Sequence, residues 1–235
     1  MTQAFPDKDK NDIKRMVREV FRNLADMGLE TIKTLKMDEN ELKRHITIRE
    51  NKASVDFFAL PGSCVLAMGH FGQWEWGHIL LGLQSRPKNY QVVFLKIKNQ
   101  NFNTLMNRVR SRFGNTTIKM EHAFKQMILK RDNNLITCFL PDLRPQSNKA
   151  GRGVDFFNIS QPFYDGPEKI ATQLDIPVFF ASVFRKSRGY YEVVLDQITA
   201  QPKEEPAGFI TEGYVSRLED AIKIQPESWT WVRDL

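Results

Sequence analysis

Short runs of β-branched and aromatic residues alternate with helical patterns from residue 63 onward, and this alternation constrains the fold more than any other feature. The runs cover residues 63–68, 90–95, 135–140, 178–184 and 190–195. Amphipathic helical patterns alternate with them, at residues 74–83, 102–113, 121–130, 167–174 and 212–224. Such alternation is typical of βα units, in which helices pack on a sheet. The sequence therefore predicts an α/β fold, with a single-domain mixed sheet flanked by helices.

The N-terminal part of the chain follows a different pattern. Between Asp9 and Leu35 the apolar residues recur mostly at spacings of three and four, as on an amphipathic helix, and 41–46 continues the pattern after a break. We expect an N-terminal helical segment over residues 1–50 and an α/β core over residues 51–235, which together form one structural domain. Loops rich in proline, glycine and charge are expected at 141–153 and 199–208.

The charge balance favours an anionic partner. Lysine and arginine number 34 against 28 acidic residues, which gives a net charge of +6. Such a surface attracts phosphate, a membrane surface, nucleic acid or an acidic carrier protein. No apolar run approaches the roughly 20 residues that a bilayer-spanning helix needs, so we expect any membrane contact of this sequence to be peripheral.

The two cysteines are expected to be buried thiols in a reducing compartment. Cys64 and Cys138 each lie inside an apolar run that reads as a strand. The alternative, a nucleophilic cysteine, requires exposure and an electropositive neighbour.

The stretch Met68–His78 holds the main candidate site, because it lies where a buried strand ends and a helix begins. Ligands bind at such junctions in α/β sheets. His70 could act there as a general base, provided that an acceptor orients its second ring nitrogen. Glu75 could be that acceptor if the chain turns between them, which Gly69 and Gly72 permit. The alternative is that His70 only ends a strand and that Glu75 is a solvated helix residue.

A metal site is the other chemical interpretation of this stretch. Glu75 and His78 are spaced like a carboxylate-x-x-His pair of bundle metal sites. No second such pair and no cysteine pair completes a ligand set, so we expect no metal.

His70 and Glu75 form a His-x4-Glu pattern that resembles the His-x4-Asp/Glu signature of glycerolipid acyltransferases. Within that superfamily the chain is similar to the late, or secondary, acyltransferases of bacterial lipid A biosynthesis. Segments that resemble this subgroup follow in the same order: Asn101–Gly114 with its Arg-x-x-x-Gly ending, Phe139–Asp142, Phe156–Pro167, and the tail Leu218–Trp231. The sequence departs from the family pattern at Gln73, Leu143 and Asn158.

The resemblance covers nearly the whole chain and implies a glycerolipid-acyltransferase-like fold. It implies transfer of a fatty acyl chain from a thioester donor, expected to be acyl carrier protein, to a hydroxyl of a lipid A-type precursor. His70 would be the general base and Glu75 its partner, and no cofactor or metal is expected.

Further residues would bind the substrates. Arg110 matches the family's active-site arginine, which suits a phosphate or a developing oxyanion, although it also reads as part of a solvated helix face. Asp142 could hold an acceptor hydroxyl or pair with an arginine, or be a plain turn residue. Gly166 begins a helix whose amides could face an anion, although Asp165 reads equally well as its N-cap. Beside His70, Phe71, Gly72 and Gln73 would contact substrate, and Phe71 is expected to limit acyl-chain length or else to be an ordinary core residue.

Two alternatives remain open from the sequence. The first is an acyltransferase that acts on a lysophospholipid or an amino-acid lipid. The second is a non-catalytic basic module that binds anionic membrane or nucleic acid; it gives His70 and Glu75 no role, and no nucleic-acid motif supports it, so no nucleic acid partner is expected. The resemblance implies a protein at the cytoplasmic face of the bacterial inner membrane. Family members carry an N-terminal hydrophobic anchor before a segment like Ala4–Lys8; this sequence does not contain it and is expected to be soluble or peripheral.

Overall fold

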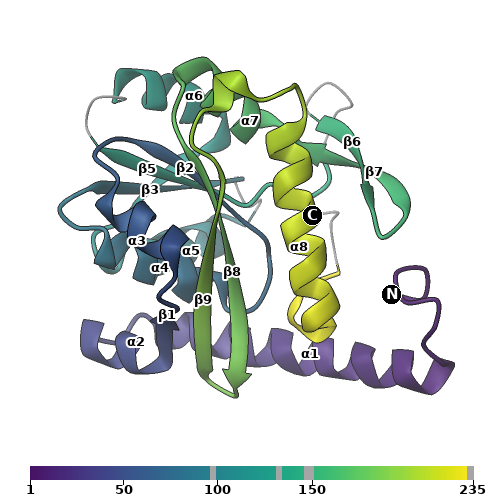
Figure 1. The fold of residues 1–235 in the computed structure, drawn as a ribbon. Coiled ribbons are helices and arrows are strands. Elements are labelled where there is room, and N and C mark those ends of the chain that lie inside the picture. Colours follow the sequence, from purple (N-terminus) through teal and green to yellow (C-terminus); the bar gives the residue numbers. More distant parts are fainter. Residues whose placement is uncertain (96–98, 131–133, 146–150, 232–235) are drawn as a thin grey trace.

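A mixed sheet organises the fold of the computed structural model, which describes residues 1–95, 99–130, 134–145 and 151–231. The strands lie in the order β1-β9-β8-β2-β5-β3-β4 (Figure 1). All neighbours are parallel except β8 and β9, which form an antiparallel pair. The bounds are β1 (Ile46–Ile48), β2 (Cys64–Met68), β3 (Asn89–Phe94), β4 (Thr116–Lys119), β5 (Leu135–Phe139), β8 (Val178–Ser187) and β9 (Tyr190–Thr199). The predicted α/β class with a mixed sheet is confirmed.

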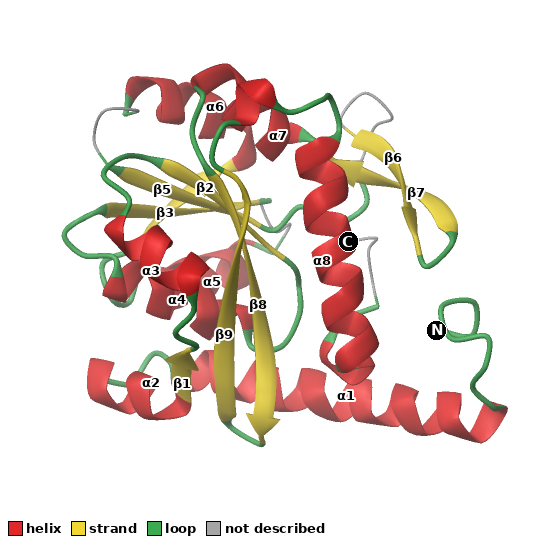
Figure 2. Cartoon of the chain, in the orientation of Figure 1, coloured by secondary structure: helices red, strands yellow, loops and turns green. Residues whose placement is uncertain are grey.

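Helices cover both faces of this sheet (Figure 2). On one face lie α3 (Lys52–Ala59), α4 (Trp74–Gln84) and α5 (Gln100–Arg110), and on the other α6 (Met120–Leu129), α7 (Gly166–Leu174) and α8 (Phe209–Ile224). A separate antiparallel hairpin of β6 (Gly151–Phe156) and β7 (Ile159–Tyr164) packs beside α8.

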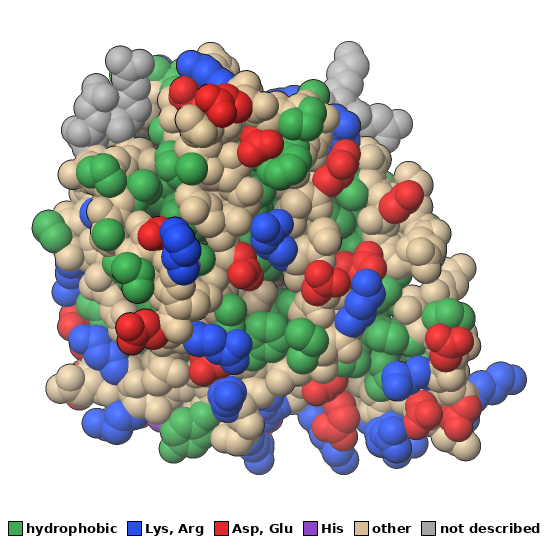
Figure 3. Space-filling model, in the orientation of Figure 1, with side chains coloured by type: hydrophobic (Ala, Val, Ile, Leu, Met, Phe, Trp, Pro, Cys, Tyr) green, Lys and Arg blue, Asp and Glu red, His purple; other side chains and the backbone are tan. Residues whose placement is uncertain are grey.

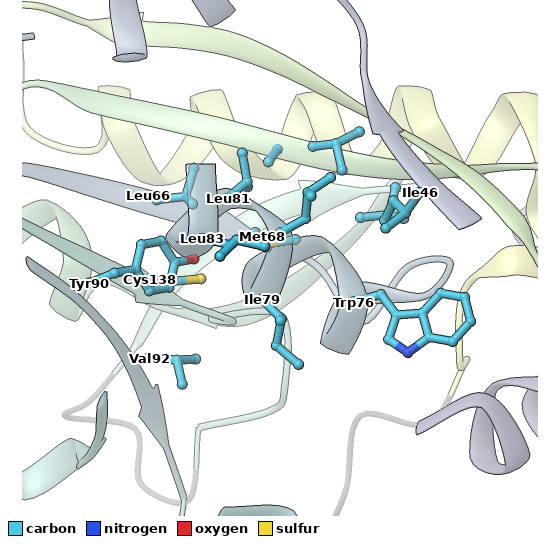
Figure 4. Close-up of a cluster of buried hydrophobic side chains, with 14 of the residues drawn as sticks. Ile46, Leu66, Met68, Trp76, Ile79, Leu81, Leu83, Tyr90, Val92 and Cys138 are labelled. Carbon is cyan, nitrogen blue, oxygen red and sulfur yellow. The ribbon is translucent and has the colours of Figure 1, made fainter. Parts of the chain in front are cut away.

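The central strand β2 separates two hydrophobic cores. Its residues alternate between the faces, as the pleat of a strand requires. Cys64, Leu66 and Met68 join the core beneath α4, whereas Val65 and Ala67 join the core beneath α7 and α8. Figure 4 shows Leu66 and Met68 in the first of these cores. All five are buried, so β2 is fixed from both sides and the position of the residues that follow it is well determined.

The N-terminal residues lie along one edge of the molecule. Helix α1 (Lys10–Lys33) begins at Asp9, whose carboxylate accepts hydrogen bonds from the amides of Asn11 and Asp12. It runs along the lower edge of the view in Figure 1, and α2 (Glu39–His45) follows it. Strand β1 then pairs in parallel with β9, so residues before position 50 belong to the same sheet. No helix in the described ranges is both long enough and apolar enough to span a membrane.

The structure adds elements that the sequence patterns did not predict. These are β1, α3, β4 and the hairpin β6–β7. The prediction of a loop over 141–153 is wrong at its C-terminal end, because β6 begins at Gly151. Residues 146–150 of the predicted loop lie outside the described residues. The expected loop at 199–208 contains the short 3-10 helix η2 (Pro202–Glu204), and another, η3 (Pro226–Ser228), follows α8.

Candidate active site

His70 and Asp142 meet at the carboxyl edge of the sheet. Strands β2 and β5 are parallel neighbours, so the residues that follow them emerge at the same edge. The His70 Nδ1 atom lies 2.6 Å from Asp142 Oδ1, and the His70 backbone amide donates to Asp142 Oδ2 at 2.8 Å. One carboxylate thus fixes both the backbone and the ring of the histidine.

The environment keeps Asp142 ionised. Burial acts to raise the pKa of this carboxyl group, but the charge of His70 and hydrogen bonds from His70 and Trp229 outweigh burial and lower the pKa. The Trp229 indole Nε1 donates to Asp142 Oδ2 at 3.0 Å. Because an ionised carboxylate only accepts hydrogen bonds, Nδ1 of His70 carries the proton, and Nε2 is the basic nitrogen.

The structure differs here from the expected His70–Glu75 pair, because His70 takes Asp142 as its partner. Glu75 lies in the first turn of α4 and its carboxylate binds Arg110 instead, with Nη2 donating to Oε1 at 2.6 Å and Nε at 3.1 Å. The ring beside His70 is that of Trp74, at 5.0 Å between centroids and an edge-on angle of 71°. The start of α4 turns Glu75 toward α5 and presents Trp74 to the histidine.

Glu75, Arg110 and His78 form a buried charged cluster. His78 Nε2 lies 2.9 Å from Glu75 Oε2, and the side chains of His78 and Glu75 are 1% and 4% exposed. Burial acts to raise the pKa of Glu75, but the Arg110 charge and hydrogen bonds from His78 and Arg110 reverse this and hold the pKa far below its usual value. Glu75 also raises the pKa of Arg110 against the effect of burial. Glu75 is therefore an anion that anchors Arg110, and the alternative interpretation of Glu75 as a solvated helix residue is wrong.

A cavity of about 500 Å³ opens beside His70 and Arg110. This volume is within the range of small-molecule sites. Its wall is mostly apolar, and its polar groups include His70, Glu75, His78, Arg110 and Lys169. The apolar lining includes residues of β3 and the residue after it, of α6, and of the end of β5 and the segment that follows it: Val92, Val93, Phe94, Leu95, Met120, Ala123, Phe124, Phe139, Leu140, Pro141 and Leu143.

Gly166 also lines this cavity, at the start of α7. The expected N-cap bond from Asp165 is not formed by its side chain, which pairs with Lys169 at 2.8 Å. The amino end of α7 thus forms part of the cavity wall.

Phe71 does not line the cavity, contrary to the expected role in measuring the acyl chain. Its side chain is 1% exposed and packs edge-on against Phe184 at 5.4 Å. The backbone of Phe71 forms an isolated antiparallel bridge with Trp229. The core interpretation of Phe71 holds.

Gly72 and Gln73 likewise fasten the loop and do not line the cavity. Gly72 has φ +61°, and a Cβ atom there would lie 1.8 Å from the carbonyl oxygen of Val183, so only glycine fits. The Gln73 amide donates to Glu30 Oε2 at 2.9 Å and to the Met27 carbonyl at 3.1 Å, both on α1. These residues hold the turn that carries His70.

The cysteines are unsuited to nucleophilic chemistry. Both are free and buried, and burial raises the pKa of the Cys64 and Cys138 thiols to about 12. A thiol with such a pKa stays protonated near neutral pH.

A comparison with known protein families assigns the chain to a family. A family model described as bacterial lipid A biosynthesis acyltransferase matches residues 1–235. The chain belongs to this family. It is therefore an acyltransferase, and the family resemblance inferred from its motifs is confirmed at that level. A search of curated proteins found no significant match.

Sequence reasoning missed two side chains of this acyltransferase site. Trp229, which binds Asp142, lay unremarked within the tail segment Leu218–Trp231, and Trp74 was not distinguished from its neighbours. The signal for the His70–Asp142 pair was present, since both residues follow strands that were predicted. The neighbouring positions of these two strands in the sheet are what the sequence does not show.

Proposed function

We propose that this acyltransferase moves a fatty acyl chain from a thioester, supplied by acyl carrier protein, to a hydroxyl group of a lipid A-type precursor. The observation that carries the proposal is the His70–Asp142 pair at the edge of a largely apolar cavity. An apolar cavity suits an acyl chain, and an oriented histidine suits proton abstraction from an alcohol.

In the proposed reaction, Nε2 of His70 takes the proton of the acceptor hydroxyl. The hydroxyl oxygen attacks the thioester carbonyl, and the tetrahedral intermediate then expels the carrier thiolate, which takes up the proton from the imidazolium. Asp142 holds the productive tautomer and stabilises the imidazolium, as the carboxylate of a hydrolase triad does. The bond formed is an oxygen ester and the bond broken is the thioester.

Arg110 is the proposed electrostatic partner of this step. Arg110 lines the cavity, and Glu75 fixes its guanidinium through Nε and Nη2. The remaining N–H groups of Arg110 are donors for a thioester oxyanion or for a phosphate of the acceptor. In this account Glu75 positions Arg110 and does not touch the substrate.

The lipid A interpretation and the alternative catalytic interpretation differ only in the acceptor, because His70 could equally take a proton from a lysophospholipid or an amino-acid lipid. Lys169 and Arg110 line the cavity and favour an acceptor that carries phosphate, such as a lipid A precursor or a lysophospholipid, over an amino-acid lipid. The membrane surface is proposed as the place of reaction, at the cytoplasmic face of the inner membrane, because both the chain and its acceptor would meet there.

Mass spectrometry of lipids from cells that lack the gene tests the acceptor. We expect lipid A that has lost one secondary acyl chain, and its recovery when wild-type protein, but not the His70→Ala variant, is supplied. Unchanged lipid A together with an altered phospholipid or aminolipid would contradict the lipid A assignment and leave acyl transfer in place.

A further inference from the structure

The outward side of α1 differs in charge from the rest of the helix. We define the outer face of α1 as its exposed apolar and basic residues: Lys10, Lys14, Val17, Arg18, Phe21, Leu29 and Ile32. Phe21 and Leu29 are each 68% exposed, Ile32 is 53% exposed and Val17 is 37% exposed. Helix positions three, four and seven apart share a side, so these residues form one continuous strip.

The acidic residues of α1 all lie off this strip. Asp26 binds Arg185 and Arg188 at 2.7 Å each, and Glu30 accepts from the Tyr191 hydroxyl at 2.8 Å. Asp12 and Glu19 lie on the same side of the helix as Asp26, because these three residues are spaced seven apart. They pair with Arg15 and Arg22. In Figure 3, lysine and arginine side chains project from the lower edge of the molecule, where α1 runs, and acidic side chains lie beside them. The outer face thus carries cations and large apolar groups with no carboxylate among them.

We propose that the outer face of α1 is a docking surface for a phospholipid bilayer with anionic head groups. A helix that combines exposed aromatic and aliphatic residues with lysine and arginine lies in the plane of a membrane interface, with the apolar groups below the head groups and the cations beside the phosphates. Charge complementarity selects the anionic bilayer as the occupant. A second copy of the chain fits poorly, because an isologous contact through this face would set cations against cations.

The inner side of the same helix reaches the catalytic loop. Glu30 and the Met27 carbonyl hold Gln73, which lies three residues after His70. Leu24 and Met27 also line a small cavity together with Trp74, whose ring packs against His70. A bilayer bound to the outer face would therefore lie one helix away from the loop that carries the base. The inference rests on the membrane setting of the proposed function, but the outer face itself contributes no residue to the catalytic cavity.

Co-sedimentation with vesicles tests this surface without any acyl-transfer step. Wild-type protein is mixed with phosphatidylcholine vesicles with or without phosphatidylglycerol, at low and high salt. We expect binding that requires phosphatidylglycerol and falls as salt rises. The Phe21→Ser/Ile32→Ser variant and the Lys14→Gln/Arg18→Gln variant should each bind about tenfold more weakly.

Matched controls change equally exposed apolar residues elsewhere. Val55 on α3 and Ile224 on α8 are 54% and 68% exposed, so Val55→Ser/Ile224→Ser should bind like wild type. Thermal unfolding checks that each variant is folded. A second exposed patch, on α6, is tested by Ile128→Ser/Leu129→Ser. The proposal would be overturned if both α1 variants bound vesicles like wild type, or if only the α6 variant lost binding. It would also be overturned if the α1 variants lost affinity for soluble acyl carrier protein but kept vesicle binding.

Discussion

At the scale of single residues, the chemistry depends on how one carboxylate holds one histidine. Asp142 accepts from both the ring and the backbone amide of His70, and Trp229 donates to the same carboxylate. The imidazole ring of His70 cannot rotate without breaking its hydrogen bond to Asp142. The His70 backbone cannot move without breaking the hydrogen bond from its amide to the same carboxylate. This double attachment leaves Nε2 as the nitrogen that can accept a proton.

Asp142→Asn should therefore slow acyl transfer with little change in the affinity for substrate. An amide of the same size can hold the ring but favours the wrong tautomer, and the corresponding change in the serine protease triad lowers kcat about 10⁴-fold. We expect a loss of about 10²–10⁴-fold in kcat, with KM within a few-fold of wild type. Steady-state kinetics measure both, and a normal kcat would remove Asp142 from the mechanism.

The sequence identified His70 but not its partner. The prediction assumed that the hydrogen-bond acceptor of His70 is close to it in sequence, as Glu75 is. Asp142 instead follows a neighbouring strand and reaches His70 from there. A carboxylate at the end of a neighbouring parallel strand is as close in space as one on the next helical turn. Strand order is set by packing over the whole sheet, so the residue patterns around His70 alone could not decide between them.

At the scale of elements, the Glu75–Arg110 pair joins the start of α4 to the end of α5. Both charges are largely buried, and each compensates the desolvation of the other. His78, one turn further along α4, adds a third contact. The alternative interpretation of Arg110 as part of a solvated helix face is therefore wrong.

Glu75→Gln should lower the free energy of unfolding by about 3–5 kcal/mol at neutral pH, because Arg110 stays buried without a counter-charge. Chemical denaturation measures this. The matched control is Glu19→Gln, which removes a pair whose side chains are 71% and 41% exposed and should cost about 0–1 kcal/mol.

The same pair predicts a pH dependence. The folded pKa of Glu75 lies below its usual value of 4.5, so the stabilisation is fully present above that pH and is lost as the pH falls toward the folded pKa. The difference in unfolding free energy between wild type and Glu75→Gln should therefore shrink on acidification below about 4.5. A difference that grows in acid would contradict the assigned charge state.

The turn between β2 and α4 should not tolerate a side chain at Gly72. In Gly72→Ala the new Cβ would meet the Val183 carbonyl, and the positive φ alone costs about 1–3 kcal/mol. We expect a lower melting temperature together with a loss of turnover, since the same turn carries His70. Gly62→Ala is the control, because nothing lies within 4 Å of its Cβ position, and an equal effect there would contradict the steric argument.

Elements with strong patterns were predictable and short or glycine-containing ones were not. Apolar runs such as that of β2 are buried on both sides of the sheet, and their composition shows it. Strand β6 reads Gly-Arg-Gly-Val-Asp-Phe, and only two of its residues are buried, so its sequence looks like a loop. It becomes a strand through pairing with β7, which local composition does not encode.

At the scale of the whole molecule, two cores hold the sheet and the cavity opens where several elements meet. Its wall includes residues of β3, α6 and α7, and Phe71 is not among the residues that line it. The size of the cavity is therefore a property of the assembled layers. A residue next to the base in sequence does not set it.

A wall residue should control the length of the acyl chain. Ala123 on α6 lines the cavity and is 2% exposed, so Ala123→Leu should fill part of the cavity and shift preference toward shorter acyl donors. Phe71→Leu, which alters the core beside the loop, should lower turnover for all lengths alike. Acyl carrier donors of graded length measure both variants, and an unchanged profile in Ala123→Leu would contradict the assignment of the cavity to the acyl chain.

The central claim is that His70 transfers an acyl group from a carrier thioester to a lipid hydroxyl. The most direct measurement follows labelled acyl groups from acyl carrier protein into a lipid A precursor with purified wild-type protein and with folded His70→Ala. The account predicts an oxygen-ester product with one added acyl chain for wild type and a loss of at least about 10³-fold for the variant. Equal product formation by both proteins, or no ester product with any lipid alcohol, would contradict it.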